Sequence, residues 1–148
     1  MNPDQFKRHL NGVQLEIKTF VNRDAPRIAA KVAIDHFKEN FQNERFEKKK
    51  WKEVKRRKDK HIRGARRTRK ILTGDTGDLG RSFENAQYSQ AKATIISDLP
   101  YSAVHNEGLR AGRGRGFKMP KRQFMGGSTK LNELTKQELT KKFNTIIK

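Results

Sequence analysis

Cysteine is absent from the 148-residue chain, so the sequence offers no disulfide, no thiolate nucleophile and no cysteine-based metal site. No stretch approaches the roughly 18–20 apolar residues that span a bilayer, and residues 1–20 lack the apolar core of a signal peptide. Hydrophobic residues make up only 32% of the chain. We therefore expect a soluble protein with a single domain, residues 1–148, whose core is small or is completed by a partner.

Acidic residues are scarce in two segments that hold nearly all of the net charge of +19. Residues 45–70 carry 15 Lys or Arg against three acids, and residues 109–123 carry six Lys or Arg and no acid. The rest of the chain is close to neutral. Concentrated charge of one sign repels itself, and a polyanionic partner is the usual compensation. Aromatic residues are few in both segments, so neither offers a stacking platform for single-stranded nucleic acid.

From these segments we expect sequence-independent contacts with duplex DNA or with an acidic protein surface. The predicted DNA or partner contacts are Lys48, Lys49, Lys50, Arg56, Arg57, Arg63, Arg66, Arg67, Arg69, Arg113 and Arg115. Residues 45–70 contain few large apolar side chains, so we expect part of that segment to be extended or mobile. The glycine-rich composition of residues 109–118 predicts a flexible loop.

Apolar periodicity predicts helices near both ends of the chain. Residues 3–43 carry apolar stripes at steps of three and four, interrupted near Pro26, which predicts two helices or one long kinked helix. Asp24 is a candidate N-cap at the interruption, and Pro26 is tolerated in a first helical turn. Residues 128–147 predict a C-terminal helix, with Ser128 as its candidate cap.

In the middle of the chain the apolar residues no longer follow the helical spacing. A glycine-rich turn at 73–80 precedes two predicted strands, 81–88 and 91–97, and a short predicted helix ends at Gly108. Residues 109–126 form a basic loop and then a segment containing Pro120 and Phe124. The predicted fold class is α+β: N-terminal helices and a C-terminal helix packed on a small antiparallel sheet, with two basic extended loops.

The sequence shows no catalytic constellation. The glycine-rich turn lacks the spacing of a phosphate-binding loop, and its Asp75 and Asp78 would repel a phosphate. His105 and Glu107 have no third metal ligand spaced near them. We expect no enzymatic activity, cofactor or metal. The alternative of a metal-dependent phage nuclease would have to use Asp75 and Asp78.

Four features in register resemble the Mu-type virion morphogenesis, or tail-completion, family of tailed bacteriophages. They are Trp51 after the N-terminal helices, the element T-G-D-L-G-R-S-F at 76–83, P-Y-S-A-V-H-N-E-G at 100–108 and M-P-K-R-Q-F-M-G at 119–126. Family members look like T-G-x-L-x-x-S-I, Y-A-x-I-H-x-x-G and P-x-R-x-F-L-G at these places. Phe83 and Ser102 depart from the usual Ile and Ala.

The resemblance implies a structural protein of the phage neck or tail end, similar to head–tail connector and tail-terminator proteins. Such a protein would be made in the host cytoplasm and would form a ring that completes the tail or joins head to tail. The implied partners are further copies in a hexameric ring, neighbouring neck and tail-tube proteins, and duplex DNA, with no membrane. The predicted oligomer contacts are Tyr101, His105, Gly108, Pro120, Arg122, Phe124 and Met125. Charge alone leaves a second hypothesis, a small basic nucleic-acid-binding protein.

Overall fold

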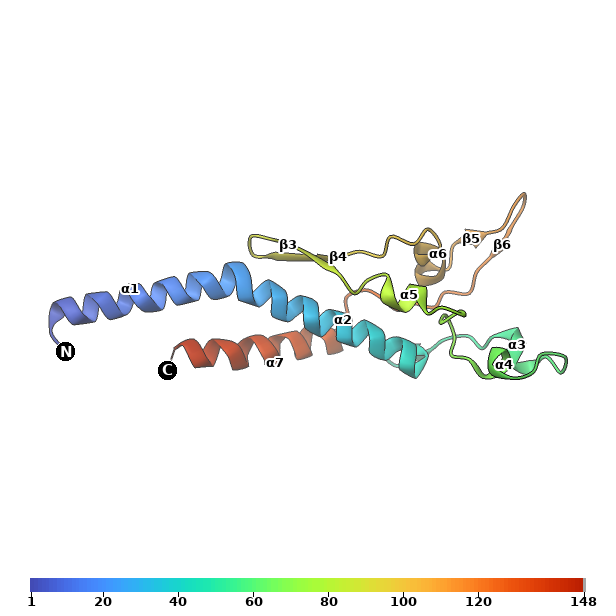
Figure 1. Cartoon of the computed structure of the whole chain (residues 1–148), viewed down its shortest axis with the longest axis horizontal. Coiled ribbons are helices and arrows are strands. Elements are labelled where there is room, and N and C mark those ends of the chain that lie inside the picture. The colour runs from blue at the N-terminus through green and yellow to red at the C-terminus, as the bar shows by residue number, and fades with distance from the viewer. Residues whose placement is uncertain (148) are drawn as a thin grey trace. The chain divides into compact units, whose positions relative to one another are not determined.

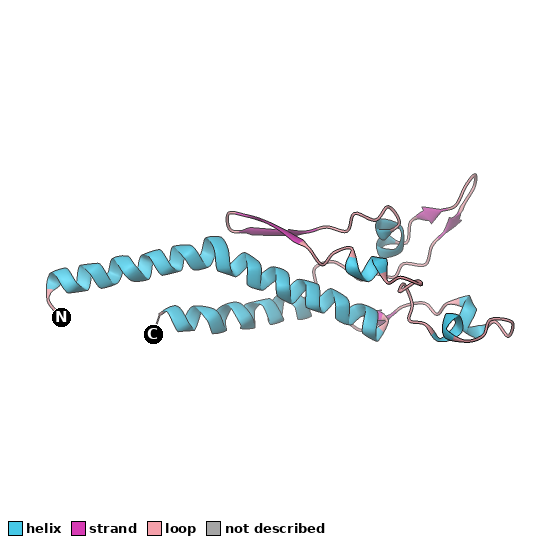
Figure 2. Cartoon of the chain, viewed as in Figure 1, coloured by secondary structure: helices cyan, strands magenta, loops and turns pink. Residues whose placement is uncertain are grey.

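The computed structural model describes residues 1–147 as helices joined by short antiparallel strand pairs (Figures 1 and 2). The predicted α+β class is confirmed. The chain divides into two compact units: the first comprises residues 1–33, 86–94 and 129–148, and the second residues 34–85 and 95–128. The single domain expected from chain length stays a prediction.

A long N-terminal helix forms most of the first unit. Helix α1 (Pro3–Thr19) begins with a capping box, in which the Asn2 side chain accepts the Gln5 N–H and the Gln5 side chain accepts the Asn2 N–H, at 2.8 and 3.0 Å. The helix passes through one π-helical turn, η1 (Phe20–Asp24), into α2 (Ala25–Asn43). The prediction that Asp24 caps a second helix is wrong, because helical backbone runs through it. Its carboxylate instead accepts from Arg23 Nε at 2.8 Å.

Pro26 accounts for the position of the π turn. Its ring nitrogen has no hydrogen to donate to the carbonyl of Asn22, four residues earlier. The N–H of Ala91, in the turn between β3 (Ala86–Ser89) and β4 (Lys92–Ile95), donates to that carbonyl at 3.3 Å. The Arg27 guanidinium also lies 5.9 Å from the centre of the Tyr88 ring. The released carbonyl thereby becomes the point at which the β3–β4 hairpin attaches.

The C-terminal helix α7 (Thr129–Ile146) begins directly after Ser128, where the sequence predicts its start. Within the first unit, α7 contacts α1, and the rings of Phe20 and Phe143 lie 5.7 Å apart. No helix within residues 1–147 combines the length and the apolar character that a membrane crossing needs.

Aromatic rings form the core of the second unit. Phe37 and Phe41 come from α2, Phe83 follows the short helix α5 (Asp78–Arg81), and Phe124 comes from the segment before α7. The Phe41 ring centre lies 5.9 Å from that of Phe83 and 5.1 Å from that of Phe124. Phe83 and Phe124 are fully buried. The strand predicted from residue 81 starts only at Ala86, because α5 and the burial of Phe83 take up the residues before it.

The remaining elements of the second unit are short. The basic segment 45–70 contains the strand pair β1 (Arg45–Phe46) and β2 (Lys49–Lys50), followed by α3 (Lys55–Lys58) and α4 (Ala65–Thr68). Helix α6 (Ser102–Glu107) confirms the short predicted helix, and Gly108 ends it in the left-handed region.

The loop expected at 109–118 contains a strand pair. Strand β5 (Arg110–Ala111) pairs antiparallel with β6 (Phe117–Lys118). Gly116 at the bend has φ of 55°, and a Cβ there would lie 2.5 Å from the Ala111 carbonyl oxygen. Because no other residue fits so close an approach, the glycines favour a defined bend as much as flexibility.

Candidate assembly surface

Glu44 fixes the basic segment to the end of α2 through several hydrogen bonds. Its carboxylate accepts from Arg57 Nη1 at 2.8 Å, from Arg57 Nη2 at 2.5 Å and from the N–H of Ile71 at 2.8 Å. Its carbonyl accepts the N–H of Trp51 at 2.8 Å. Glu44 directly follows the helix with φ of 49°, a conformation that usually favours glycine. These bonds hold it there and tie both ends of the segment together.

Arginines in the segment hydrogen-bond to its own backbone carbonyls. The Arg56 guanidinium donates to three carbonyls between residues 66 and 70, at 2.9 to 3.1 Å. Arg57 donates to the Arg69 carbonyl at 3.0 Å, and Arg67 donates to the Arg57 carbonyl at 3.2 Å. These bonds hold the segment in place of the large apolar side chains that it lacks.

The predicted contact residues therefore fall into two groups. Arg56, Arg57 and Arg69 bind within the chain; the last forms an ion pair with Asp75. The others are exposed, although Arg67 also donates to the Arg57 carbonyl: Lys48, Lys49, Lys50, Arg63, Arg66 and Arg67 in the basic segment, and Arg113 and Arg115 in the β5–β6 hairpin. These eight side chains form what we call the basic surface.

The basic segment is also bonded to residues 120–126. Trp51 Nε1 donates to the Gln123 carbonyl at 2.8 Å, and the Trp51 ring packs edge-on against Phe41. Arg122 Nε and Nη2 both donate to the Lys52 carbonyl, at 3.1 and 2.9 Å. The features by which the sequence resembles the virion morphogenesis family thus meet in one packed region.

Asn106 joins this region to α6. Its side-chain oxygen accepts the N–H groups of Phe124 and Met125, at 2.9 and 3.0 Å. The Arg122 N–H donates to the His105 carbonyl at 2.8 Å. Sequence reasoning missed Glu44 and Asn106 as organising residues. Asn106 carried a weak signal, since an amide side chain readily bonds backbone groups. No sequence signal marked Glu44, because a glutamate is unusual at a positive φ.

The predicted oligomer contacts are placed as follows. Tyr101 is exposed, and His105, Pro120 and Met125 are partly exposed. Gly108, Arg122 and Phe124 are buried within the protomer. The structure places Phe124 in the core of its own chain, against Phe41 and Phe83. Gly108 and Phe124 are covered by the side chains around them, whereas Arg122 lines a cavity of the second unit.

Burial lowers the pKa of the His105 imidazole, and the nearby Arg122 guanidinium lowers it further.

The acidic side chains weighed as metal ligands have partners within the chain. Glu107 is paired with Lys121 at 3.2 Å. Asp78 accepts from Thr76 at 2.5 Å and from Arg81 at 3.0 Å, which lowers its pKa. Within residues 1–147, no three His, Cys, Asp or Glu side chains are grouped as metal ligands.

Replacing Glu44 with Gln tests whether its carboxylate holds the basic segment in place. The Arg57 hydrogen bond chiefly lowers the pKa of Glu44 below its ordinary value of 4.5. A lowered folded-state pKa stabilises the fold above that value, and the contribution is lost as the pH falls through the folded pKa. We expect Glu44→Gln to reduce the free energy of unfolding at pH 7 by about 1–3 kcal/mol. The deficit should vanish in acid, as measured by urea unfolding followed through Trp51 fluorescence.

Glu47→Gln is the matched control, since Glu47 lies in the same segment with an exposed side chain. It should change the unfolding free energy by less than about 0.5 kcal/mol. An equal loss in both variants would show that net charge, rather than the Arg57 pairing, matters.

Comparison with known proteins identifies the family. The model of the phage virion morphogenesis family matches residues 4–144, which is nearly the whole chain. No curated protein and no solved structure gives a significant match. The chain belongs to the phage virion morphogenesis family, so its role lies in building the phage virion.

Proposed function

We propose that the protein is a non-enzymatic structural component of the phage neck or tail end. Copies assemble into a six-fold ring that completes the tail or joins it to the head. The basic surface faces packaged DNA in the channel or an acidic neighbouring neck or tail-tube protein. The family supports a virion role, and one observation carries the finer proposal: six of the eight side chains of the basic surface stand on a segment that Glu44 and Trp51 fix to the core.

A basic surface held in a fixed position is better suited to contacting a polyanion than to recognising a particular base sequence. Lys48–Lys50 lie at the β1–β2 turn, and Arg63, Arg66 and Arg67 lie at and before α4. Such side chains contact phosphates or carboxylates without reading bases. The two basic segments would carry about +108 in a ring of six copies, which favours a polyanion beside them.

The ring is tested by native mass spectrometry of the purified protein, alone and with purified tails. We expect a closed oligomer under at least one of these conditions. Phage that lack the protein should accumulate separate DNA-filled heads and separate tails, visible by electron microscopy. A protein that stays monomeric in both conditions, or mutant phage with joined particles, would refute the proposal.

The basic surface itself is tested by a salt titration of DNA binding. If eight charges meet phosphates, the logarithm of the binding constant should fall against the logarithm of salt with a slope of about −7. Equal binding to duplexes of different sequence is expected. Tight binding selective for one RNA structure would instead favour a cellular nucleic-acid-binding protein.

A further inference from the structure

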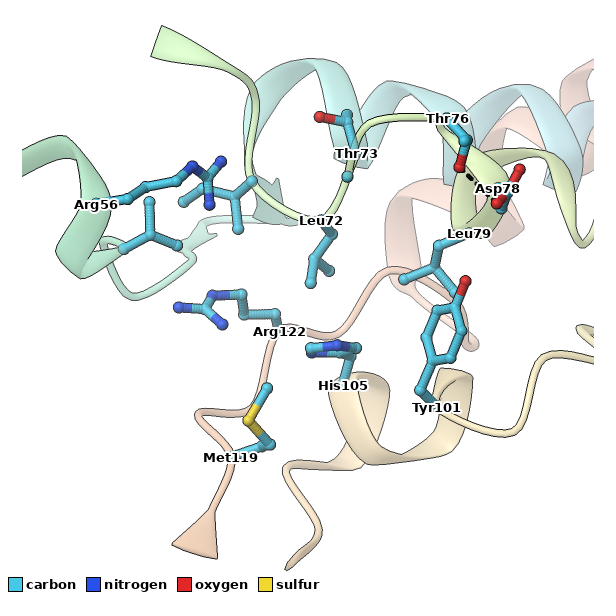
Figure 3. A pocket seen from close by; sticks show the side chains of 13 residues that line it. Arg56, Leu72, Thr73, Thr76, Asp78, Leu79, Tyr101, His105, Met119 and Arg122 are labelled. Atoms are coloured by element: carbon cyan, nitrogen blue, oxygen red, sulfur yellow. Dashed lines mark hydrogen bonds between the residues drawn. The ribbon is translucent and has the colours of Figure 1, made fainter. Parts of the chain in front are cut away.

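A cavity of about 430 Å³ lies within the second unit, between the 71–79 turn, α6 and the Met119–Arg122 segment. Its lining changes character from one end to the other (Figure 3). Arg56 and Arg122 lie at one end, and Tyr101 lies at the other with Asp78 beyond it (Figure 3). The side chain of Leu72 stands between these ends. The cavity thus has a cationic end and an apolar floor.

At the cationic end, no carboxylate of residues 1–147 is bonded to either guanidinium. Arg122 is only 6% exposed, and its bonds go to the Lys52 carbonyl. Arg56 likewise bonds to carbonyls, and within residues 1–147 neither guanidinium forms an ion pair with a carboxylate. Glu53, whose charge influences Arg122, is bonded to Arg57 at 3.3 Å. Burial and the neighbouring charge of Arg56 both lower the pKa of Arg122. Two like charges held together and only partly compensated favour an anion beside them.

The apolar floor includes a strained residue. Leu72 has φ of 64°, a conformation that costs a branched side chain free energy. Its side chain points into the cavity and is partly exposed (Figure 3). Leu79, which is buried, and Tyr101, which is 41% exposed, continue the apolar lining. Strain of this kind is retained where it positions a side chain for contact.

We propose that this cavity binds an acidic segment of another virion protein, with a carboxylate against Arg56 and Arg122 and a neighbouring apolar side chain on Leu72 and Tyr101. Charge complementarity favours this occupant, because a second copy brings the same excess of +19. Duplex DNA brings phosphates but no apolar group to cover the floor. The inference rests on the proposed function only for the source of the segment.

Binding is measured by fluorescence anisotropy at about 0.15 M salt with a labelled synthetic peptide. The probe has the core Asp-Leu-Glu-Phe-Glu between flanking Gly-Ser residues. One control peptide replaces the acids with Asn and Gln, and the other replaces Leu and Phe with Ser. We expect each control peptide to bind about tenfold more weakly or worse. NMR shifts of the Leu72 and Tyr101 amides should locate the acidic peptide in the cavity.

Variants separate the cavity from general charge attraction. Arg56→Gln should weaken binding about tenfold, whereas Arg63→Gln, which removes one exposed charge of the same segment, should leave it within about twofold. Leu72→Gly is the sharper variant. Glycine relieves the positive φ, so the unfolding midpoint should hold or rise while peptide binding falls about tenfold.

Several results would overturn the proposal. If either control peptide binds equally well, or if Arg56→Gln and Arg63→Gln lose equal affinity, the peptide binds by general charge attraction to the surface and not in the cavity. Duplex DNA that shifts the Leu72 and Tyr101 amides would make the cavity a phosphate site. An oligomer that Leu72→Gly dissociates would make the occupant a second copy. Peptide binding does not require a ring, so its failure is distinguishable from failure of the ring.

Discussion

Phe124→Ala should reduce the free energy of unfolding by about 3–5 kcal/mol. Phe124 has no exposed surface and its ring lies 5.1 Å from Phe41 and 5.9 Å from Phe83. Its N–H and carbonyl are bonded to Asn106 and Asn40. Truncation would leave a cavity between residues that are held in place by these bonds. Urea unfolding followed through Trp51 fluorescence measures the loss.

Phe117→Ala is the matched control for that variant. Phe117 is 58% exposed on β6, so its truncation should cost less than about 1 kcal/mol. Similar losses for the two variants would contradict a core centred on Phe124.

Gly108→Ala should be destabilising by about 2–5 kcal/mol, for two separable reasons. Gly108 has φ of 70°, which costs an alanine about 1–2 kcal/mol. A Cβ would also lie 2.9 Å from the backbone nitrogen of Lys121, and moving that backbone adds about 1–3 kcal/mol. The Arg122 N–H to His105 carbonyl bond spans this contact, so hydrogen exchange at the Arg122 amide should accelerate.

Gly77→Ala separates the two contributions. Gly77 is also in the left-handed region, with φ of 73° and ψ of 17°, but the atoms nearest to a Cβ there would lie at 3.7 and 3.9 Å, which is ordinary van der Waals contact. Only the cost of the backbone conformation, about 1–2 kcal/mol, is therefore expected. If Gly108→Ala is no worse than Gly77→Ala, the close approach of Lys121 is not important for stability.

The helices could be predicted because their signals are local. Apolar spacing placed α1, α2 and α7 close to their observed positions, and the glycine at 108 marked the end of α6. The interruption at Pro26 was also visible. The use of the released Asn22 carbonyl could not be predicted, because it accepts the N–H of Ala91, which is far away in the sequence.

The candidate site was harder to predict because its residues meet across long separations. In the sequence Arg57 looks like Arg63, yet the first is bonded to Glu44 and the second is exposed. No local pattern distinguishes an arginine that bonds carbonyls from one that faces solvent. Phe83 lies in a stretch with strand-like composition, and only its contacts with Phe41 and Phe124 explain why it belongs to the core.

The strand pairs have a consequence for the isolated chain. Each ladder contains two strands, so each strand leaves one edge with unpaired backbone donors and acceptors. Such edges invite pairing with another chain. Lysines and arginines line β1, β2, β5 and β6, so two copies that approach edge to edge bring like charges together. The same residues that mark the chain as basic therefore oppose edge-to-edge aggregation of the free protein.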